Sequence, residues 1–229
     1  MTRRTFQSTV ASAAFPLERL LAQDAKAILA KVTDAYESLS SYHFVGKTLS
    51  ETTIKTHTTR NELNFIAAYQ APDKFRLEFR YPDAGKWVRA SDGQFLREVR
   101  TLTKEARKTP VDQNTIYLIH GSPTYNFEKL SRTATKPVVL KSEIVSVGGQ
   151  QVDCQVVQFE SHRRELREGE TPGPSMVWIA KDSSIIVREE LRTFAAVRGE
   201  RSESKRTTTI ETFSINKTLS QDLFSTSMA

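Results

Sequence analysis

The sequence has very few residues of the kinds that form covalent or metal-bound sites. Among its 229 residues there is one cysteine, Cys154, so an intramolecular disulfide and a cysteine-based zinc or iron–sulfur site are both excluded. The four histidines are scattered without the close spacing of a metal site; they are His43, His57, His120 and His162. We therefore expect neither a metal nor a cofactor.

Catalytic motifs are also missing. There is no Gly-x-Ser-x-Gly turn for a nucleophile and no glycine-rich loop for a phosphate. The adjacent carboxylates of Glu189 and Glu190 would point to opposite faces of a strand, so they cannot act there as a pair. Cys154 stands in the apolar, strand-like stretch QQVDCQVVQFE, which favours a buried and inert thiol. We expect no catalytic residue and a protein that is not an enzyme.

Neither a long apolar run nor a block of one charge is present. The formal charge is +6, from 33 Lys and Arg against 27 Asp and Glu, and the two signs are mixed along stretches such as RGERSESKR. A nucleic-acid footprint would be a clustered basic stripe, and the stretch REVRTLTKEARK lacks the aromatic residues on which bases stack. No run approaches the roughly eighteen apolar residues of a membrane span. We expect no nucleic-acid partner.

What is present begins with an export-like N-terminus. The residues TRRTF, from Thr2 to Phe6, resemble the twin-arginine export signature, and the small-residue run STVASAAFPL follows them. This resemblance implies export across a bacterial inner membrane to the periplasm. We therefore divide the chain into an export-signal-like segment, residues 1–23, and one domain, residues 24–229. The alternative is a short amphipathic N-terminal helix with a basic start.

One long helix is predicted from Asp24 to Tyr42, with Asp24 as its N-cap. Apolar residues recur there at three- and four-residue spacing and form a single stripe; they are Ile28, Val32, Ala35, Tyr36 and Leu39.

Strands dominate the rest of the sequence. In KFRLEFRY, the residues Phe75, Leu77 and Phe79 alternate with charged residues, which is the period of a strand with one apolar face. Asp92-Gly93 and Gly148-Gly149 each separate two extended runs and predict tight hairpins. About nine to eleven strands follow one another, mostly as hairpins, so the sheet is predicted to be mainly antiparallel. The stretch from 110 to 131 breaks this rhythm and favours short helical turns.

The apolar surface of so many strands is larger than the helices predicted from the sequence can cover. Strands lie about 4.8 Å apart, so about ten of them in a flat sheet span roughly 45–50 Å, whereas one helix is about 10 Å across. The sheet must therefore curl onto itself, split into two packed layers or enclose a cavity.

The ordered set of these pieces resembles the LolA-like superfamily of periplasmic lipoprotein carriers and sensors. A helix ending in Leu-x-Ser-Tyr is followed by APDKFRLEF, SDGQFLREV, VWIAKDSSIIVREE and FSINKTLSQDLF, over roughly residues 25–225. The resemblance implies an α+β fold: a curved, open, half-barrel antiparallel sheet wrapped around the N-terminal helix. It also implies a short helical lid over an apolar cavity that holds acyl chains.

The resemblance places the cavity on the apolar strand faces and the lid in the irregular segment. The expected cavity residues are Phe65, Phe75, Leu77, Phe79, Trp87, Phe159, Val177, Ile179 and Val187. The expected lid residues are Ile116, Tyr117, Leu118 and Ile119. Family carriers hold the lid through an arginine inside the barrel, and the candidates here are Arg60, Arg76 and Arg89. For any single aromatic residue, ordinary core packing is the alternative.

Three functions remain open at this point. The first is a periplasmic monomer that binds the acyl chains of a lipid or lipoprotein for carriage or sensing, with a possible inner- or outer-membrane protein partner. The second is an envelope-stress regulatory module that binds a membrane-anchored protein through its apolar face. The third is a structural β-sandwich whose apolar faces meet each other.

Overall fold

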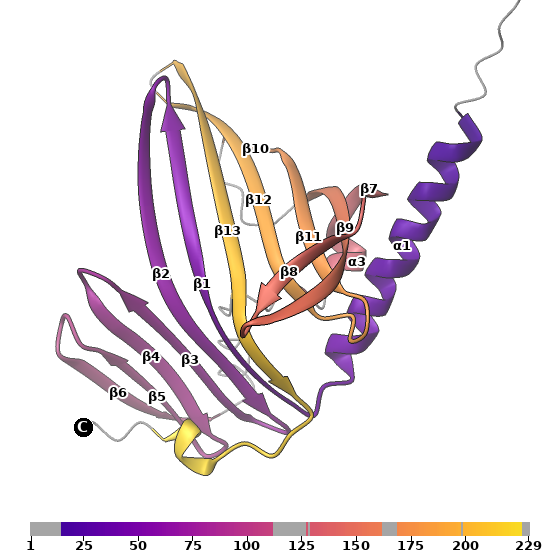
Figure 1. Ribbon diagram of the computed structural model, residues 1–229. Coiled ribbons are helices and arrows are strands. Elements are labelled where there is room, and N and C mark those ends of the chain that lie inside the picture. Colours follow the sequence, from indigo (N-terminus) through magenta and orange to yellow (C-terminus); the bar gives the residue numbers. More distant parts are fainter. Residues whose placement is uncertain (1–14, 112–126, 128, 162–168, 198, 226–229) are drawn as a thin grey trace, which may run out of the picture.

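The computed structural model describes residues 15–111, 127, 129–161, 169–197 and 199–225. A long helix, α1 (Phe15–Glu37), comes first, and a one-turn helix α3 (Leu130–Thr133) and a 3₁₀ turn η2 (Gln221–Phe224) come later. The remaining elements are strands (Figure 1); they are β1 (Ser41–Ile54), β2 (His57–Gln70), β3 (Lys74–Tyr81), β4 (Gly85–Asp92), β5 (Phe95–Arg100), β6 (Glu105–Pro110), β7 (Ala134–Val139), β8 (Glu143–Val147), β9 (Gln150–Ser161), β10 (Thr171–Pro172), β11 (Pro174–Ala180), β12 (Ile186–Val197) and β13 (Glu200–Ile215).

All thirteen strands belong to one sheet, with the order β6-β5-β4-β3-β2-β1-β13-β12-β11-β9-β7. β10 pairs with β12, and β8 pairs with β9. Two meanders, β1 to β6 and β7 to β13, meet where β1 pairs with β13. Within the described ranges every pairing is antiparallel, and β6 and β7 stand at opposite ends of the order, so the sheet is not closed. The prediction of a mainly antiparallel sheet is confirmed, and the two-layer sandwich that the sequence left open is not formed by these residues.

The sheet has two different faces. On β3, Leu77 and Phe79 are buried in one cluster with the apolar stripe of α1, whereas Arg76 and Glu78 point the other way because side chains alternate along a strand. We call the face that packs on α1 the helix face and the opposite one the far face. Figure 1 shows α1 beside the end of the sheet that holds β7 and β9, away from β4, β5 and β6.

Helix α1 differs from the predicted helix at both ends. It begins at Phe15, so Asp24 is an interior residue and not the N-cap; Pro16 does not prevent this, because proline is tolerated in a first helical turn. It ends at Glu37, because residues from Ser41 onward pair with both β2 and β13 as a strand. Tyr42 is therefore in β1. The buried stripe of α1 has the predicted spacing of three or four residues and consists of Ala25, Leu29, Val32 and Tyr36, and buried Leu39 follows the helix. Ile28 and Ala35, which were also predicted for the stripe, are only partly buried.

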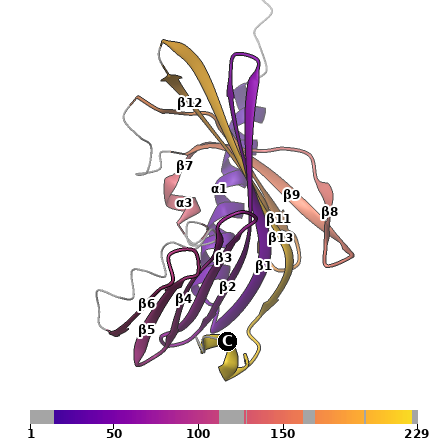
Figure 2. The same ribbon diagram turned by 90° about the vertical axis from the view of Figure 1, so that its left-hand side faces the viewer.

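A smaller apolar cluster lies on the far face. Its buried members are Val147, Cys154, Val156, Trp178, Ala180 and Val187. They come from the β8–β9 hairpin and from β11 and β12, and β8 also approaches β13. Figure 2 shows β8 on the other side of β13 from α1. Cys154 is buried as predicted, and burial raises the pKa of its thiol to about 11, so the thiol stays protonated at neutral pH.

The predicted tight hairpins are confirmed. Gly93 joins β4 to β5 with φ of 95°, and the Asp92 carboxylate accepts hydrogen bonds from the backbone of the turn. Gly148 and Gly149 join β8 to β9 with φ of 59° and 79°, the region where glycine is strongly favoured. β6 has no counterpart in the prediction, because its sequence EARKTP offers no apolar alternation to recognise.

Candidate functional site

The helix face carries most of the residues that the sequence predicted to line a cavity. Six of them are buried in one cluster with the stripe of α1; they are Phe65, Leu77, Phe79, Phe159, Val177 and Ile179. Trp87 packs against the edge of the same cluster. The sheet thus brings together residues from β2, β3, β4, β9 and β11 that lie far apart in the sequence.

Phe75 lies on the same face but is not a member of that cluster. It is 3% exposed, and alternation along β3 puts it on the side of Leu77 and Phe79. It stands in register with Tyr69 on β2 and Ser91 on β4, at the end of the sheet where β1 begins.

Val187 lies on the far face, in the cluster with Trp178, and not with the other predicted cavity residues. The reason is a bulge in β12: Trp178 pairs with Arg188, but the next residue of β11, Ile179, pairs with Ile186. Val187 is the extra residue between these pairs, and such a bulge reverses the alternation that follows it.

The four predicted lid residues, Ile116 to Ile119, lie outside the described residues. The end of the irregular segment is described, and it packs on the helix face. The Phe127 ring meets the Tyr36 ring edge-on, with centroids 5.8 Å apart, and Leu130 of α3 is buried in the same cluster. The hydroxyls of Thr33 on α1 and Ser131 on α3 are 2.7 Å apart and form a hydrogen bond. This end of the segment is therefore fixed to α1.

Several members of the cluster were not predicted from the sequence. They include Leu29, Phe44, Ile185, Ile186, Leu191 and Ile210. The alternation in SYHFVG could have identified Phe44, because it is two residues from Tyr42. Ile185 and Ile186 are adjacent, so alternation gives no choice between faces there. The Tyr36 hydroxyl accepts a hydrogen bond from the backbone N–H of Ile186 at 3.3 Å, which joins α1 to the start of β12.

At its β4 edge the apolar cluster meets a group of charged side chains. The rings of Phe79 and Trp87 are stacked with centroids 5.6 Å apart. The guanidinium carbon of Arg89 lies 4.3 Å from the centroid of the Trp87 ring, and that of Arg100 lies 5.5 Å from it. Glu98 accepts one hydrogen bond from Nε of Arg89 at 2.9 Å and forms an ion pair with Arg100 at 3.0 Å. Burial alone would raise the pKa of Glu98, but the hydrogen bond and charge of Arg89 outweigh it, and the pKa lies below its ordinary value.

Of the three arginines considered as holders of a lid, only Arg89 stands on the helix face. Its cross-strand partner on β3 is Leu77, whose side chain lies in the cluster with α1. Arg76 is on the far face, where it binds Glu78 and donates to the carbonyl oxygens of the C-terminal segment. Arg60 is an exposed far-face residue paired with Glu51.

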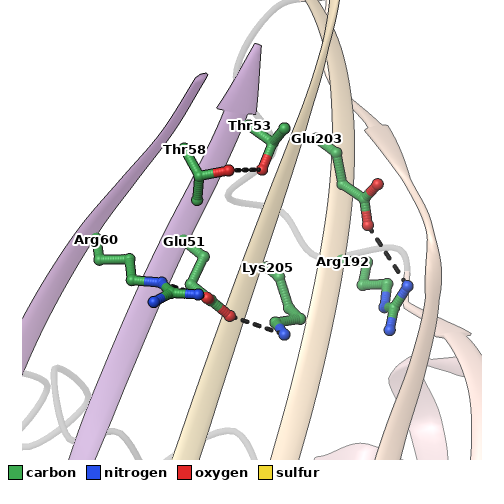
Figure 3. A pocket seen from close by; sticks show the side chains of 7 residues that line it. All are labelled: Glu51, Thr53, Thr58, Arg60, Arg192, Glu203 and Lys205. Atoms are coloured by element: carbon green, nitrogen blue, oxygen red, sulfur yellow. Dashed lines mark hydrogen bonds and ion pairs between the residues drawn. The ribbon is translucent and has the colours of Figure 1, made fainter. Parts of the chain in front are cut away.

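An open hollow of about 250 Å³ lies on the far face, over β2, β1, β13 and β12 (Figure 3). Its lining is polar; it consists of Glu51, Thr53, Thr58, Arg60, Arg192, Glu203 and Lys205. Glu51 binds Lys205 at 2.7 Å and Arg60 at 2.9 Å, and these partners hold the pKa of Glu51 below its ordinary value. Arg192 lies 3.4 Å from Glu203. Because these charged side chains are already paired with one another, the hollow has few charged groups left to bind a ligand.

Other kinds of site find no support in the described part of the chain. No three His, Cys, Asp or Glu side chains gather there as a metal site. No helix among the described residues is long and apolar enough to cross a bilayer. Glu189 and Glu190 are both buried, and they point to opposite faces as predicted: Glu189 pairs across the ladder with Thr208 and Glu190 with Thr207.

The chain resembles solved structures at low sequence identity. Mycobacterium tuberculosis lipoprotein LppX is 14% identical with a TM-score of 0.46, and the match covers 87% of this chain and 99% of LppX. A LolA superfamily protein from Nitrosomonas europaea is 12% identical with a TM-score of 0.31, over 88% of this chain and 97% of that one. A chain of the Pseudomonas aeruginosa MucA/MucB complex is 10% identical with a TM-score of 0.45, over 89% of this chain and 61% of that one.

No protein-family model matches the sequence, and no curated protein matches it. The Nitrosomonas europaea match is a LolA superfamily protein, the superfamily that the sequence pattern resembles. Identities of this size bear on the arrangement of the strands alone and not on what the protein binds.

Proposed function

We propose that the helix face holds the acyl chains of a lipid or lipoprotein, for carriage or for sensing, and that the protein is a non-enzymatic binding protein of the periplasm. In this proposal the sheet is a curved, open half-barrel around α1, and the N-terminal segment, residues 1–23, directs export. The bound chains lie against the apolar residues of β2, β3 and β4.

The observation that supports this proposal is the reach of buried apolar surface beyond the helix. Leu77 and Phe79 on β3 are only 3% and 9% exposed, while α1 makes its main contacts with β7 and α3, toward the other end of the sheet. Strands lie about 4.8 Å apart and a helix is about 10 Å across, so α1 cannot cover both places. Leu77 and Phe79 are therefore covered by parts of the protein other than α1. In this proposal an acyl chain takes the place of that cover.

Apolar contact alone is enough to drive such binding. Transfer from water contributes about 0.8 kcal/mol per buried methylene, so a chain of about fifteen methylenes gains at most roughly 12 kcal/mol. The stacked rings of Phe79 and Trp87 extend the apolar surface toward β4. No covalent bond or metal is required.

We propose Ile116, Tyr117, Leu118 and Ile119 as a lid that covers this face when no ligand is bound. The lid and the ligand would then compete, which lowers the net affinity and permits release. Deleting these four residues tests the idea, because the loss of a competitor raises lipid affinity. An unchanged affinity would count against the lid.

Native mass spectrometry of protein purified from cells tests the proposed function. Bound lipid of defined mass is the expected result, and Trp87→Ala should reduce its amount while Ile144→Ala should not, because Ile144 is 69% exposed and belongs to neither cluster. A bound protein chain in place of lipid would favour the regulatory module instead. A protein that carries neither would contradict the proposal.

A further inference from the structure

The helix face changes from apolar to charged along two rows of paired residues. Each row crosses β2, β3, β4, β5 and β6 in register. The first row is Phe65, Phe79, Trp87, Arg100 and Glu105. The second row is Ala67, Leu77, Arg89, Glu98 and Arg107. Paired residues in a ladder lie on the same face, and five strands span about 19 Å.

The charged end of these rows has more guanidinium than carboxylate. Glu98 binds both Arg89 and Arg100, and Glu105 lies 3.9 Å from Arg100. Arg107 is directly across from Glu98 but makes no hydrogen bond or ion pair with any described residue. The rows thus contain three arginines and two glutamates. Only Nε of Arg89 donates to Glu98; its Nη1 and Nη2 groups have no hydrogen-bond partner among the described residues.

The position of these donors favours a strong interaction. The Arg89 side chain is only 18% exposed and lies against the Trp87 ring, so solvent screens it less than it screens Arg107 or Arg100. A guanidinium presents paired N–H donors that match the two oxygens of a carboxylate or phosphate. A neutral head group would find no such complement here.

We propose that the three arginines of these rows, Arg89, Arg100 and Arg107, bind the oxyanion head group of an anionic amphiphile whose chain lies on Phe79 and Leu77. This inference rests on the proposed function and deepens it, because it names the ligand as a phosphate- or carboxylate-bearing amphiphile and fixes the direction in which it lies. The head is at β4 to β6, and the chain runs toward β2 and α1.

Binding of three probes by the full chain tests this assignment: dodecyl phosphate, dodecanol and inorganic phosphate, measured by titration calorimetry. Dodecyl phosphate is expected to bind at least about tenfold more tightly than dodecanol, the size of one charge-assisted hydrogen bond. Inorganic phosphate alone is expected to bind far more weakly than either, because the chain supplies most of the affinity.

Variants that remove single charges distinguish binding at the three arginines from a general effect of the protein's positive charge. Arg89→Gln is expected to weaken dodecyl phosphate about tenfold, and Arg107→Gln about threefold, with dodecanol unchanged. Arg107→Gln removes no hydrogen bond or ion pair to a described residue, so it should not unfold the protein. Arg60→Gln, the matched loss of one positive charge from the far face, should change neither. Glu98→Gln should tighten dodecyl phosphate, because it removes a competing carboxylate.

A failure of the head-group assignment can be distinguished from a failure of the proposed function. Equal binding of dodecyl phosphate and dodecanol, or equal losses in Arg60→Gln and the helix-face variants, overturns the head-group assignment and leaves the proposed function standing. Inorganic phosphate that binds as tightly as dodecyl phosphate shows an ion site without an amphiphile and also overturns it. If neither dodecyl compound binds, the proposed function itself is wrong.

Discussion

The Phe65 ring lies over Gly46, its direct partner across the β1–β2 ladder, and occupies the place where a side chain on Gly46 would begin. A Cβ at position 46 would come within 2.8 Å of Cζ of Phe65 and within 2.3 Å of the carbonyl oxygen of Thr209. A glycine in the middle of a strand is otherwise unfavourable. Here it gives the aromatic ring room on the helix face.

Gly46→Ala is therefore expected to destabilise the protein by about 1–3 kcal/mol, since the ring and the backbone of β13 must both move. Urea unfolding, followed by far-UV circular dichroism, measures the effect. The control is Ala134→Gly, which removes a methyl group from β7, whereas Gly46→Ala adds one to β1. If Gly46→Ala has the same unfolding midpoint as the wild type, the site accepts a Cβ at position 46 without strain, and the prediction is wrong.

Glu78 is a buried carboxylate on the far face, and it should make stability depend on pH. It is 2% exposed and accepts hydrogen bonds from Arg80 at 2.6 Å and from Arg76 at 3.1 Å. Burial alone would raise the pKa of Glu78, but the two arginines outweigh it, and the pKa lies below its ordinary value of 4.5. A lowered folded-state pKa means a contribution that is complete above pH 4.5 and is lost as the pH falls through the folded-state pKa.

Glu78→Gln should accordingly cost about 1.5–3 kcal/mol of unfolding free energy at pH 7, because it removes hydrogen bonds to charged donors. The difference from the wild type should shrink below pH 4.5. Denaturant titrations between pH 3 and pH 7, on the order of one per half pH unit, measure this. Glu62→Gln, an exposed position on β2, is the control and should show no such trend. A difference that stays constant over that range would contradict the assignment.

Arg76 joins β3 to the C-terminal turn η2. Its Nη1 donates to the carbonyl oxygens of Leu223 and Ser225, at 3.2 and 3.1 Å. Arg76→Ala should speed amide hydrogen exchange in η2 relative to β1 by at least about tenfold, because tenfold corresponds to one charged hydrogen bond and both bonds are lost. Lys74→Ala removes a bond from the same strand to Gln221, but that bond is exposed and its loss should have little effect. Equal exchange in the two variants would show that Arg76 does not hold the turn.

Alternation along single strands was enough to predict much of the helix face. Phe75, Leu77 and Phe79 were placed together by the period of KFRLEFRY, and β3 is a regular strand in which that period holds throughout. The tight hairpins followed from Asp-Gly and Gly-Gly, whose backbone freedom limits the possible turns. Local chemistry decides these features, so the local sequence reveals them.

Features set by pairing between distant strands could not be predicted. The bulge in β12 puts Val187 on the far face, yet nothing in SSIIVREE marks where an extra residue will be accommodated. The ends of α1 were decided by the pairing of β1 with two strands and not by the helical period. The row that joins Leu77, Arg89 and Arg107 depends on the register of four strands, and register is a property of the folded sheet.

The central claim, that acyl chains lie on the helix face, can be tested with the two tryptophans of the chain. Trp87 borders the apolar cluster on the helix face, and Trp178 is buried in the far-face cluster, where its Nε1 donates to Glu143 at 2.8 Å. A lipid with bromine on its acyl chain quenches tryptophan fluorescence only at short range. The variants Trp178→Phe and Trp87→Phe each leave one tryptophan as the reporter. Brominated lipid should quench Trp87 strongly and leave Trp178 unchanged; equal quenching of both, or quenching of Trp178 alone, would contradict the claim.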